Sequence, residues 1–208
     1  MRMILTAPEA PAREFRSALR LLRADAPAEI IMTPLSWPRW SVLLPHVLAV
    51  TGLPEVDDVP LPRSGAEEMS WLLDRAATYL AEHGRAEEAK PLLERALLID
   101  EATYGSDHPT VGVGLSNLAR VLKILGDADG ARVLLERALA IHEATYGSDH
   151  PAVAIDLGNL AEVVWELGDV TGARRLLERA LAIHEATYGS DHRQSLALRQ
   201  LLAEWVDQ

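Results

Sequence analysis

The chain has 208 residues, 49% of them hydrophobic, and a formal net charge of −11. This length and apolar content suffice for a sizeable core, and the absence of Cys excludes disulfide frameworks and thiolate metal sites. The acidic excess lies entirely in residues 66–192, which carry 22 acidic and 11 basic side chains. An acidic surface repels nucleic acid, so we predict a basic or mixed-charge partner, unless these charges only form a solvated face.

The first residues, MRMILTAPEAPAREF, contain too short an apolar run for a secretory signal. No apolar stretch of 18 residues occurs, so the sequence predicts no transmembrane helix. From these two observations we predict a cytoplasmic protein that does not bind membranes.

Residues 1–53 predict a helical extension. Pro11–Arg23 has apolar residues at helical spacing, and a second helix follows, which Pro45 should kink and Gly52 should end. We expect the apolar side chains of this second helix to pack on the next part of the chain: Trp37, Trp40, Leu43, Leu44 and Val47. Residues 54–65 hold three Pro and one Gly, a composition that predicts a linker.

A repeated stretch organises the rest of the chain. Leu134–Pro151 recurs from Leu176 and, more loosely, from Leu92, while Asp127–His150 and Asp169–His192 are identical at 21 of 24 positions. Each copy contains a tyrosine 42 residues from the next: Tyr104, Tyr146 and Tyr188. A fixed period of this length predicts a solenoid, whose units bury their apolar faces by stacking on one another.

Each copy predicts a pair of helices. Apolar residues in Val111–Leu125 step by four and three, Gly126 suits a left-handed C-terminal cap, and Asp127 suits the N-cap of a second helix. The last copy has no second helix and should form a cap. The predicted segments are 66–208 as the array, with units 66–108, 109–150 and 151–192 and a capping helix 193–208.

The repeated pattern resembles the tetratricopeptide repeat. Leu-x-x-Leu-Ala-x-x-Leu-x-x-x-Gly followed by Ala-x-x-x-Leu-x-x-Ala occurs at Leu115, Leu118, Ala119, Leu122, Gly126, Ala131, Leu135 and Ala138. The 42-residue length and the ALAIHEATYGSDHP tail are similar to the kinesin-light-chain variety. The resemblance implies an all-α, right-handed α-solenoid of about three helix pairs, with a capping helix and an N-terminal helical extension. It also implies a non-catalytic module that binds a peptide or helix of a partner protein in a concave groove.

A second resemblance concerns the N-terminal part. WPRWSVLLPH before DRAATYL resembles the segment that joins the ATPase and repeat portions of actinobacterial signalling ATPases of the STAND class. No GxxxxGK[ST] motif occurs, so the residues that would cradle a nucleotide are absent. This kinship predicts an alternative function, a regulatory or sensor arm of such an ATPase whose nucleotide-binding part is missing from this chain.

The family resemblance also assigns groove positions to the first helix of each unit. Asn117 and Asn159 are the most informative, because an amide can pair with both C=O and N–H of an extended peptide. Arg75 and Leu201 occupy the corresponding positions in the outer units, so we expect a short peptide. The predicted groove residues are Trp71, Arg75, Ser116, Asn117, Arg120, Lys123, Ile155, Asn159, Glu162, Trp165 and Glu166.

Each of these assignments has a plainer interpretation. The Asn pair could bond within its own or the next helix. Trp71 and Trp165 could simply pack between helices, Trp71 close to the N-terminal extension. Trp71 and Trp165 could otherwise anchor a ligand. Glu162 and Glu166 could face Arg120 and Lys123 across a groove for a ligand of mixed charge, or be solvated.

No catalytic, cofactor or metal site is predicted. His142-Glu143 and His184-Glu185 begin like HExxH but lack the second histidine, and the recurring loop histidines are explained by duplication. Gly112 indicates a weak spot in a helix, at a cost of about 1 kcal/mol relative to Ala. Near-identical units with exposed ends also permit self-association.

Overall fold

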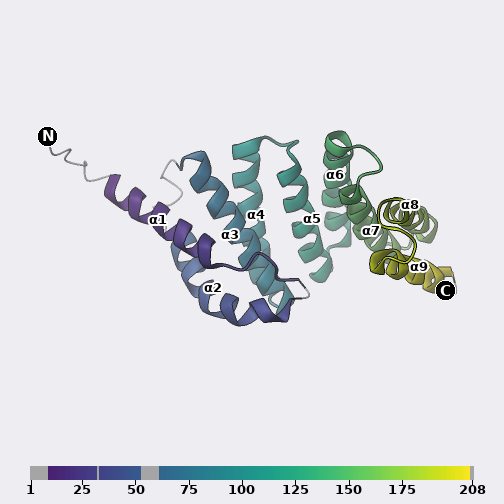
Figure 1. Cartoon of the computed structure of the whole chain (residues 1–208), viewed down its shortest axis with the longest axis horizontal. Coiled ribbons are helices and arrows are strands. Elements are labelled where there is room, and N and C mark those ends of the chain that lie inside the picture. The colour runs from purple at the N-terminus through teal and green to yellow at the C-terminus, as the bar shows by residue number, and fades with distance from the viewer. Residues whose placement is uncertain (1–8, 32, 53–60, 207–208) are drawn as a thin grey trace. The chain divides into compact units, whose positions relative to one another are not determined.

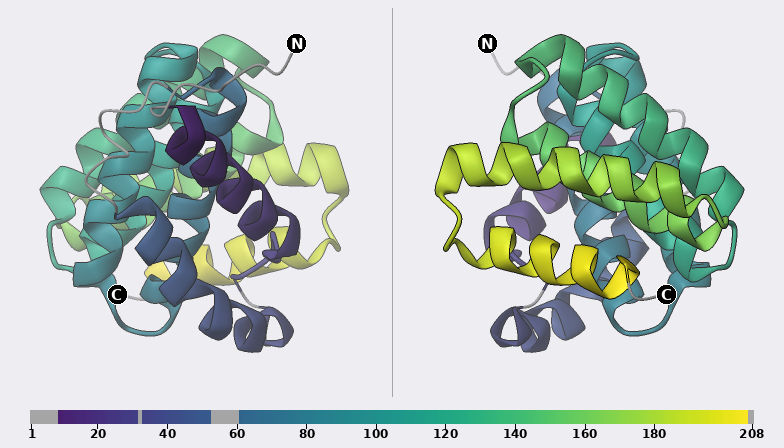
Figure 2. Two further views of the ribbon diagram at one scale, coloured as in Figure 1. Left: turned by 90° about the vertical axis from the view of Figure 1, so that its left-hand side faces the viewer. Right: turned by 90° about the vertical axis from the view of Figure 1, so that its right-hand side faces the viewer.

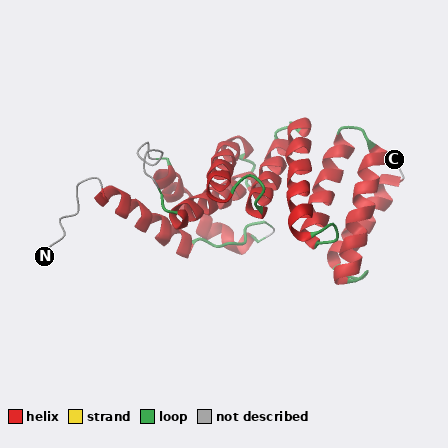
Figure 3. Cartoon of the chain, turned by 90° about the horizontal axis from the view of Figure 1, so that it is seen from above, coloured by secondary structure: helices red, strands yellow, loops and turns green. Residues whose placement is uncertain are grey.

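In the computed structural model, the described residues are 9–31, 33–52 and 61–206, and within these ranges every regular element is helical (Figure 3). The chain divides into two compact units, Met1–Thr103 and Tyr104–Gln208, which are described separately. No helix of the described ranges has the length and apolarity that crossing a lipid bilayer requires.

The first unit contains the N-terminal extension and the first helix pair (Figure 1). Both extension helices, α1 and α2, pack on α3, and they also pack on each other. The prediction that the second extension helix packs on the first repeat is confirmed, because the buried Trp40 ring stacks on Tyr79 of α3 at a centroid distance of 6.3 Å. The elements are α1 (Glu9–Asp25), the 3₁₀ turn η1 (Pro34–Ser36), α2 (Trp37–Thr51), α3 (Arg63–Glu82) and α4 (Ala86–Tyr104).

Boundaries in this unit follow the predicted signals, with one difference. Gly52 forms the C-cap of α2, as expected, and Pro45 lies inside the helix. Residues 54–60 of the predicted linker lie outside the described residues, whereas α3 begins at Arg63, three residues before the predicted start of the array. Pro62 precedes this helix with extended backbone angles, which suits a helix boundary.

The second unit holds five helices that pack in sequence order. Each helix contacts the next, and the first helices of consecutive repeats, α5 and α7, also contact each other. Figure 2 (right) shows α8 and the capping helix α9 side by side at the end of the unit. The helices are α5 (Pro109–Ile124), α6 (Ala128–Tyr146), α7 (Pro151–Glu166), α8 (Val170–Tyr188) and α9 (Arg193–Val206).

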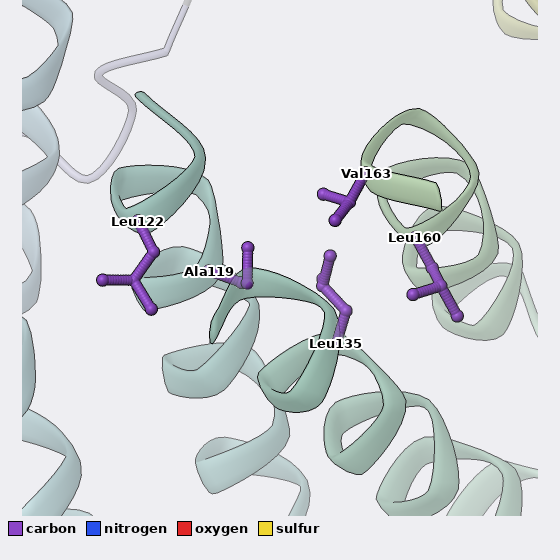
Figure 4. Packing of buried hydrophobic residues seen from close by; sticks show 6 residues of the cluster. Ala119, Leu122, Leu135, Leu160 and Val163 are labelled. Atoms are coloured by element: carbon purple, nitrogen blue, oxygen red, sulfur yellow. The ribbon is translucent and has the colours of Figure 1, made fainter. Parts of the chain in front are cut away.

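A cluster of small and branched apolar side chains holds α5, α6 and α7 together. Leu135 of α6 points between Ala119 of α5 and Val163 of α7 (Figure 4), and all three are at most 2% exposed. Alanines at the contact let the helix backbones approach closely, and leucines fill the remaining space. Truncating such a buried leucine to alanine costs about 2–5 kcal/mol. The buried members are Ala119, Leu122, Ala131, Leu135, Leu160 and Val163.

The helix signals within each pair act as predicted. Gly126 has a φ of +84°, the left-handed conformation that glycine adopts without strain. Asp127 then caps α6, because its Oδ1 accepts a hydrogen bond of 2.9 Å from the N–H of Gly130. The same cap recurs at Asp169 and Gly172 of α8, also at 2.9 Å. Three phased helix pairs with a capping helix confirm the predicted all-α solenoid fold class.

The recurring histidines of the inter-repeat loops have a structural role. His150 is the N-cap of α7, and its Nδ1 accepts a hydrogen bond of 3.1 Å from the N–H of Ala152. Its ring also stacks on Tyr146 at a centroid distance of 4.5 Å. Equivalent stacks join Tyr104 to His108 and Tyr188 to His192. The repeated Tyr-Gly-Ser-Asp-His motif is therefore a helix end, a turn and a helix start.

Candidate functional site

In the first unit, the predicted groove residues contact the N-terminal extension. The guanidinium of Arg23 on α1 stands 3.3 Å from the centroid of the Trp71 ring, a cation–π contact. Arg75, one turn further along α3, donates hydrogen bonds to Asp74 and to the carbonyl of Ala28, the latter at 3.3 Å. In this unit the two side chains therefore bind the chain's own leading segment.

In the second unit, two apolar side chains are exposed at equivalent positions of α5 and α7. Val113 is 49% exposed and Ile155 is 53% exposed. Asn159 lies one turn after Ile155; its side chain is exposed, and its amide has no hydrogen-bond partner among the described residues. Asn117 occupies the same position of α5 and is half-buried. The two helices thus present an apolar pair beside at least one amide.

The charged residues of this face pair across the two helices. The Lys123 Nζ lies 2.5 Å from Glu162 Oε2 and 3.4 Å from Glu166 Oε1, so one cation serves two carboxylates. Burial lowers the pKa of Lys123, but hydrogen bonding and charge from Glu162 and Glu166 outweigh it and leave that pKa raised. Lys123, Glu162 and Glu166 together therefore keep one net negative charge. Arg120, on the same helix as Lys123, is half-buried.

Ser116 belongs to a buried polar network that sequence reasoning missed. Its hydroxyl donates a hydrogen bond of 2.9 Å to Oδ1 of Asp156, a side chain only 2% exposed. The other carboxylate oxygen lies 2.5 Å from Nδ1 of His142, whose Nε2 lies 3.2 Å from the carbonyl oxygen of Pro109. The network joins α5, α6 and α7, so it connects two consecutive repeats.

The contacts of His142 favour its protonated form. Carboxylate and carbonyl oxygens only accept hydrogen bonds, so both ring nitrogens of His142 must donate. The hydrogen bond to Asp156 raises the pKa of His142, and its effect outweighs burial. Buried charges of this kind are tolerated because they are paired and hydrogen-bonded.

Gly112 makes room for this histidine. A Cβ atom at Gly112 would lie 2.6 Å from Nε2 of His142, closer than any real Cβ contact. The interpretation of Gly112 as only a weak spot is therefore incomplete, because the missing side chain is what lets the imidazole approach α5. The sequence could have indicated this network, because the copies differ at both positions. Ala154 is the equivalent of Gly112 in the next repeat, and Asp156 aligns with Gly114 and Leu198.

A pocket of about 200 Å³ lies between α7, α8 and α9. It brings three predicted site residues, Ile155, Asn159 and Glu162, together with residues of α8 and α9 that were not predicted. The latter are Leu177 and His184 of α8 and Gln194, Ala197, Leu198 and Leu201 of α9.

Trp165 contacts the capping helix. Its ring stacks on Trp205 of α9, with centroids 4.4 Å apart and planes at 14°. Both rings are half-buried. The structure therefore gives Trp165 a role in holding α9 against α7.

The sequence profile of the tetratricopeptide repeat family matches residues 68–129, 110–186 and 156–208. The chain belongs to the tetratricopeptide repeat family. Proteins with this fold are typically non-catalytic scaffolds that offer extended surfaces to protein partners. No curated protein matches the sequence significantly.

Solved structures of other repeat proteins resemble this tetratricopeptide repeat chain. One is a kinesin-light-chain-type protein of Podosopora anserina with nearly identical TPR-like repeats, at 23% identity and a TM-score of 0.65, over 98% of this chain and 88% of that chain. A variant of that protein matches at 24% identity and a TM-score of 0.66, over 95% and 85%. Another is BtubC (BKLC) of P. vanneervenii, at 18% identity and a TM-score of 0.63, over 95% and 85%. At these identities the likeness shows the fold alone.

Proposed function

We propose that the chain binds a peptide or helix of a partner protein along α5 and α7 of the second unit. One observation carries this proposal: Val113 and Ile155 are about half exposed at equivalent positions of two contacting helices. Single exposed apolar residues are common on protein surfaces, but Val113 and Ile155 stand at equivalent positions of contacting helices and form an apolar strip that a partner can cover. Fully burying a side chain of this size stabilises a complex by roughly 1.5–3 kcal/mol.

Polar groups beside the strip suit a peptide backbone. Asn159 lies one helical turn from Ile155, and its exposed amide offers one acceptor and two donors. A side-chain amide that bonds to a peptide backbone grips without reading sequence, while apolar pockets supply selectivity. The proposal also keeps the predicted groove roles of the other polar and charged residues on these helices: Asn117, Arg120, Lys123, Glu162 and Glu166.

The charge of the array favours a basic or mixed-charge partner. The segment 66–192 carries the whole net charge of −11, and Glu162 and Glu166 share a single lysine. Such a field speeds association with positively charged segments and weakens as salt rises. Partner binding should therefore fall with ionic strength.

Paired variants test the proposal. Val113→Asp adds a charge to the proposed strip, whereas Val133→Asp adds the same charge to α6, where Val133 is 58% exposed. Affinity capture from the source cell, followed by mass spectrometry, should lose its specific partner with Val113→Asp and retain it with Val133→Asp. The double variant Asn117→Ala with Asn159→Ala should weaken capture while circular dichroism shows unchanged helical content. Equal capture by all variants and the wild type would remove this face from consideration.

The alternative function, a regulatory arm of a STAND-class ATPase system, stays a prediction from the N-terminal resemblance. Such an arm would have to change its packing on the N-terminal extension when a ligand binds. A nucleotide-binding domain encoded beside this chain would favour the alternative. Cytoplasmic localisation and self-association likewise stay predictions.

A further inference from the structure

His184 of α8 is the counterpart of His142, 42 residues later in the repeat, and both side chains are 4% exposed. The partner differs. Asp156 of the next repeat accepts the hydrogen bond of His142, whereas the position equivalent to Asp156 in α9 is Leu198. Nδ1 of His184 is consequently buried without a hydrogen-bond partner in the described part of the chain. A buried polar atom left unsatisfied in this way destabilises the fold, and a ligand that supplies an acceptor removes that cost.

The pocket between α7, α8 and α9 has His184 and Leu198 in its lining. Small residues of α7, Ala154 and Gly158, form part of its wall. At about 30 Å³ of liquid volume per water molecule, 200 Å³ has room for a carboxylate with one or two carbon atoms attached. Leu198 stands where the preceding repeat has an aspartate, so this junction lacks the carboxylate that His142 has.

We propose that this pocket binds a carboxylate group of a ligand, which accepts a hydrogen bond from Nδ1 of His184 as Asp156 does from His142. The exposed amides of Asn159 and Gln194, which also line the pocket, can donate to the second carboxylate oxygen. The source is an acidic side chain or the C-terminal carboxylate of the partner peptide; in naming a peptide, this inference rests on the proposed function.

The charges around the pocket make binding depend on proton uptake. Burial lowers the pKa of His184, and the charge of His192 in the loop before α9 lowers it further. Glu162 of α7 lines the pocket, but its charge is paired with Lys123; the Tyr188 ring lies 5.6 Å from His184 within α8. No Lys or Arg is among the described residues of the lining. The positive charge that attracts the carboxylate must therefore come from the protonated ring of His184.

Propionate is a probe of the right size, and propionamide is its neutral counterpart. We would titrate each into the whole chain labelled with ¹⁵N-histidine and follow the ring nitrogens as a function of pH. Propionate should raise the pKa of His184 by about one unit, which corresponds to a tenfold preference for the protonated ring. His142 is the internal control, because Asp156 already occupies its Nδ1. Equal responses of both histidines, no response, or the same response to propionamide would overturn the proposal.

Variants at Leu198 give a second test. Leu198→Asp restores the aspartate of the preceding repeat, so it should raise the pKa of His184 without ligand and abolish the response to propionate. Leu198→Asn introduces a side chain of the same size as aspartate but without its charge, so it should not raise the pKa of His184. Propionate binding that persists in Leu198→Asp would place the ligand elsewhere and refute the proposal, and the titration of the wild-type chain stands even if these variants fold poorly.

Two capped peptides distinguish the sources of the carboxylate. One has a central aspartate and a C-terminal amide, and the other has only a free C-terminal carboxylate; the peptide that raises the pKa of His184 identifies the source. The two proposals also fail separately. Partner capture that depends on Val113 without a carboxylate response refutes only the pocket, whereas a carboxylate response with capture insensitive to Val113→Asp refutes only the strip.

Discussion

Two junctions of the second unit differ although their helices are nearly identical in sequence. At the first, His142 of α6 bonds to Asp156 of α7; at the second, His184 of α8 faces Leu198 of α9. The histidine is the same, and so is its burial. The electrostatic state differs because the partner belongs to the next copy of the repeat. In an array of this kind, the positions where one copy departs from its neighbour decide what each junction can bind.

The first unit contains a third version of the junction. Asp100 of α4 stands where the later repeats have histidine, is 6% exposed, and accepts a hydrogen bond of 2.5 Å from Ser70 of α3. Ser70 in turn occupies the position of Gly112. The first repeat therefore has a serine–aspartate hydrogen bond where the second has a histidine beside a glycine.

Removing the carboxylate at the first junction should have the largest effect. Asp156→Ala leaves His142 and Ser116 without their shared acceptor, and losing one partner of a buried ion pair costs about 3–5 kcal/mol. Urea denaturation measures this loss as a lower midpoint with an unchanged slope. Asp149→Ala, at an exposed loop aspartate, is the matched control and should change stability by less than about 0.5 kcal/mol. Similar midpoints for both variants would show that the network adds nothing.

Alanine at two helical glycines should act in opposite directions. Gly112→Ala puts a Cβ against His142, and overpacking costs typically about 1–3 kcal/mol, which exceeds the gain in helix propensity. Gly158→Ala in α7 meets no atom within 4 Å and should stabilise the chain by about 0.5–1 kcal/mol. Thermal unfolding should show a lower midpoint than the wild type for Gly112→Ala and a higher midpoint for Gly158→Ala. A stabilising Gly112→Ala would mean that the imidazole does not sit against α5.

Loosening the capping helix should alter only the second junction. Trp205→Ala removes the stack on Trp165, a contact worth about 0.5–1.5 kcal/mol beyond the apolar area that it buries. Amide hydrogens of α9 should exchange several-fold faster, while those of α5 and α6 keep their rates. Leu196→Ala, at a residue of α9 that is 48% exposed, is the control and should leave exchange unchanged. Uniformly faster exchange would show that α9 does not open independently.

The period of 42 residues, together with the apolar spacing and the cap residues Gly126 and Asp127, was enough to predict the helix pairs and the solenoid class. It could not predict the direction of Ser116, because a helical side chain meets whatever the neighbouring helix presents, and that neighbour was the unremarked Asp156. Packing of Trp165 between helices was one of its two interpretations, but Trp205 was not identified as the partner for the same reason. The extension helix α1 was predicted from its spacing, and the plainer interpretation of Trp71, packing on the N-terminal extension, is confirmed by its contact with Arg23.

The smallest effect should appear in the pH dependence of stability, where the two junctions oppose each other. His142 has a raised pKa when folded, so its contribution is fully present below the unfolded pKa of about 6.5 and is lost as pH rises through the folded pKa. His184 has a lowered pKa, so its contribution is present above the unfolded pKa and is lost as pH falls through the folded pKa. The two slopes partly cancel in the wild type.

Single variants should separate these slopes. His142→Gln removes the contribution that favours acidic pH, so its free energy of unfolding should rise more steeply with pH than that of the wild type. His184→Gln removes the opposite contribution, so its free energy of unfolding should fall as pH rises. Urea denaturation at pH values below and above about 6.5 measures both slopes. His46→Gln, at an exposed residue of α2, is the control. Parallel pH profiles for all three variants would mean that the two histidines share one environment, and the difference between the junctions would then not be electrostatic.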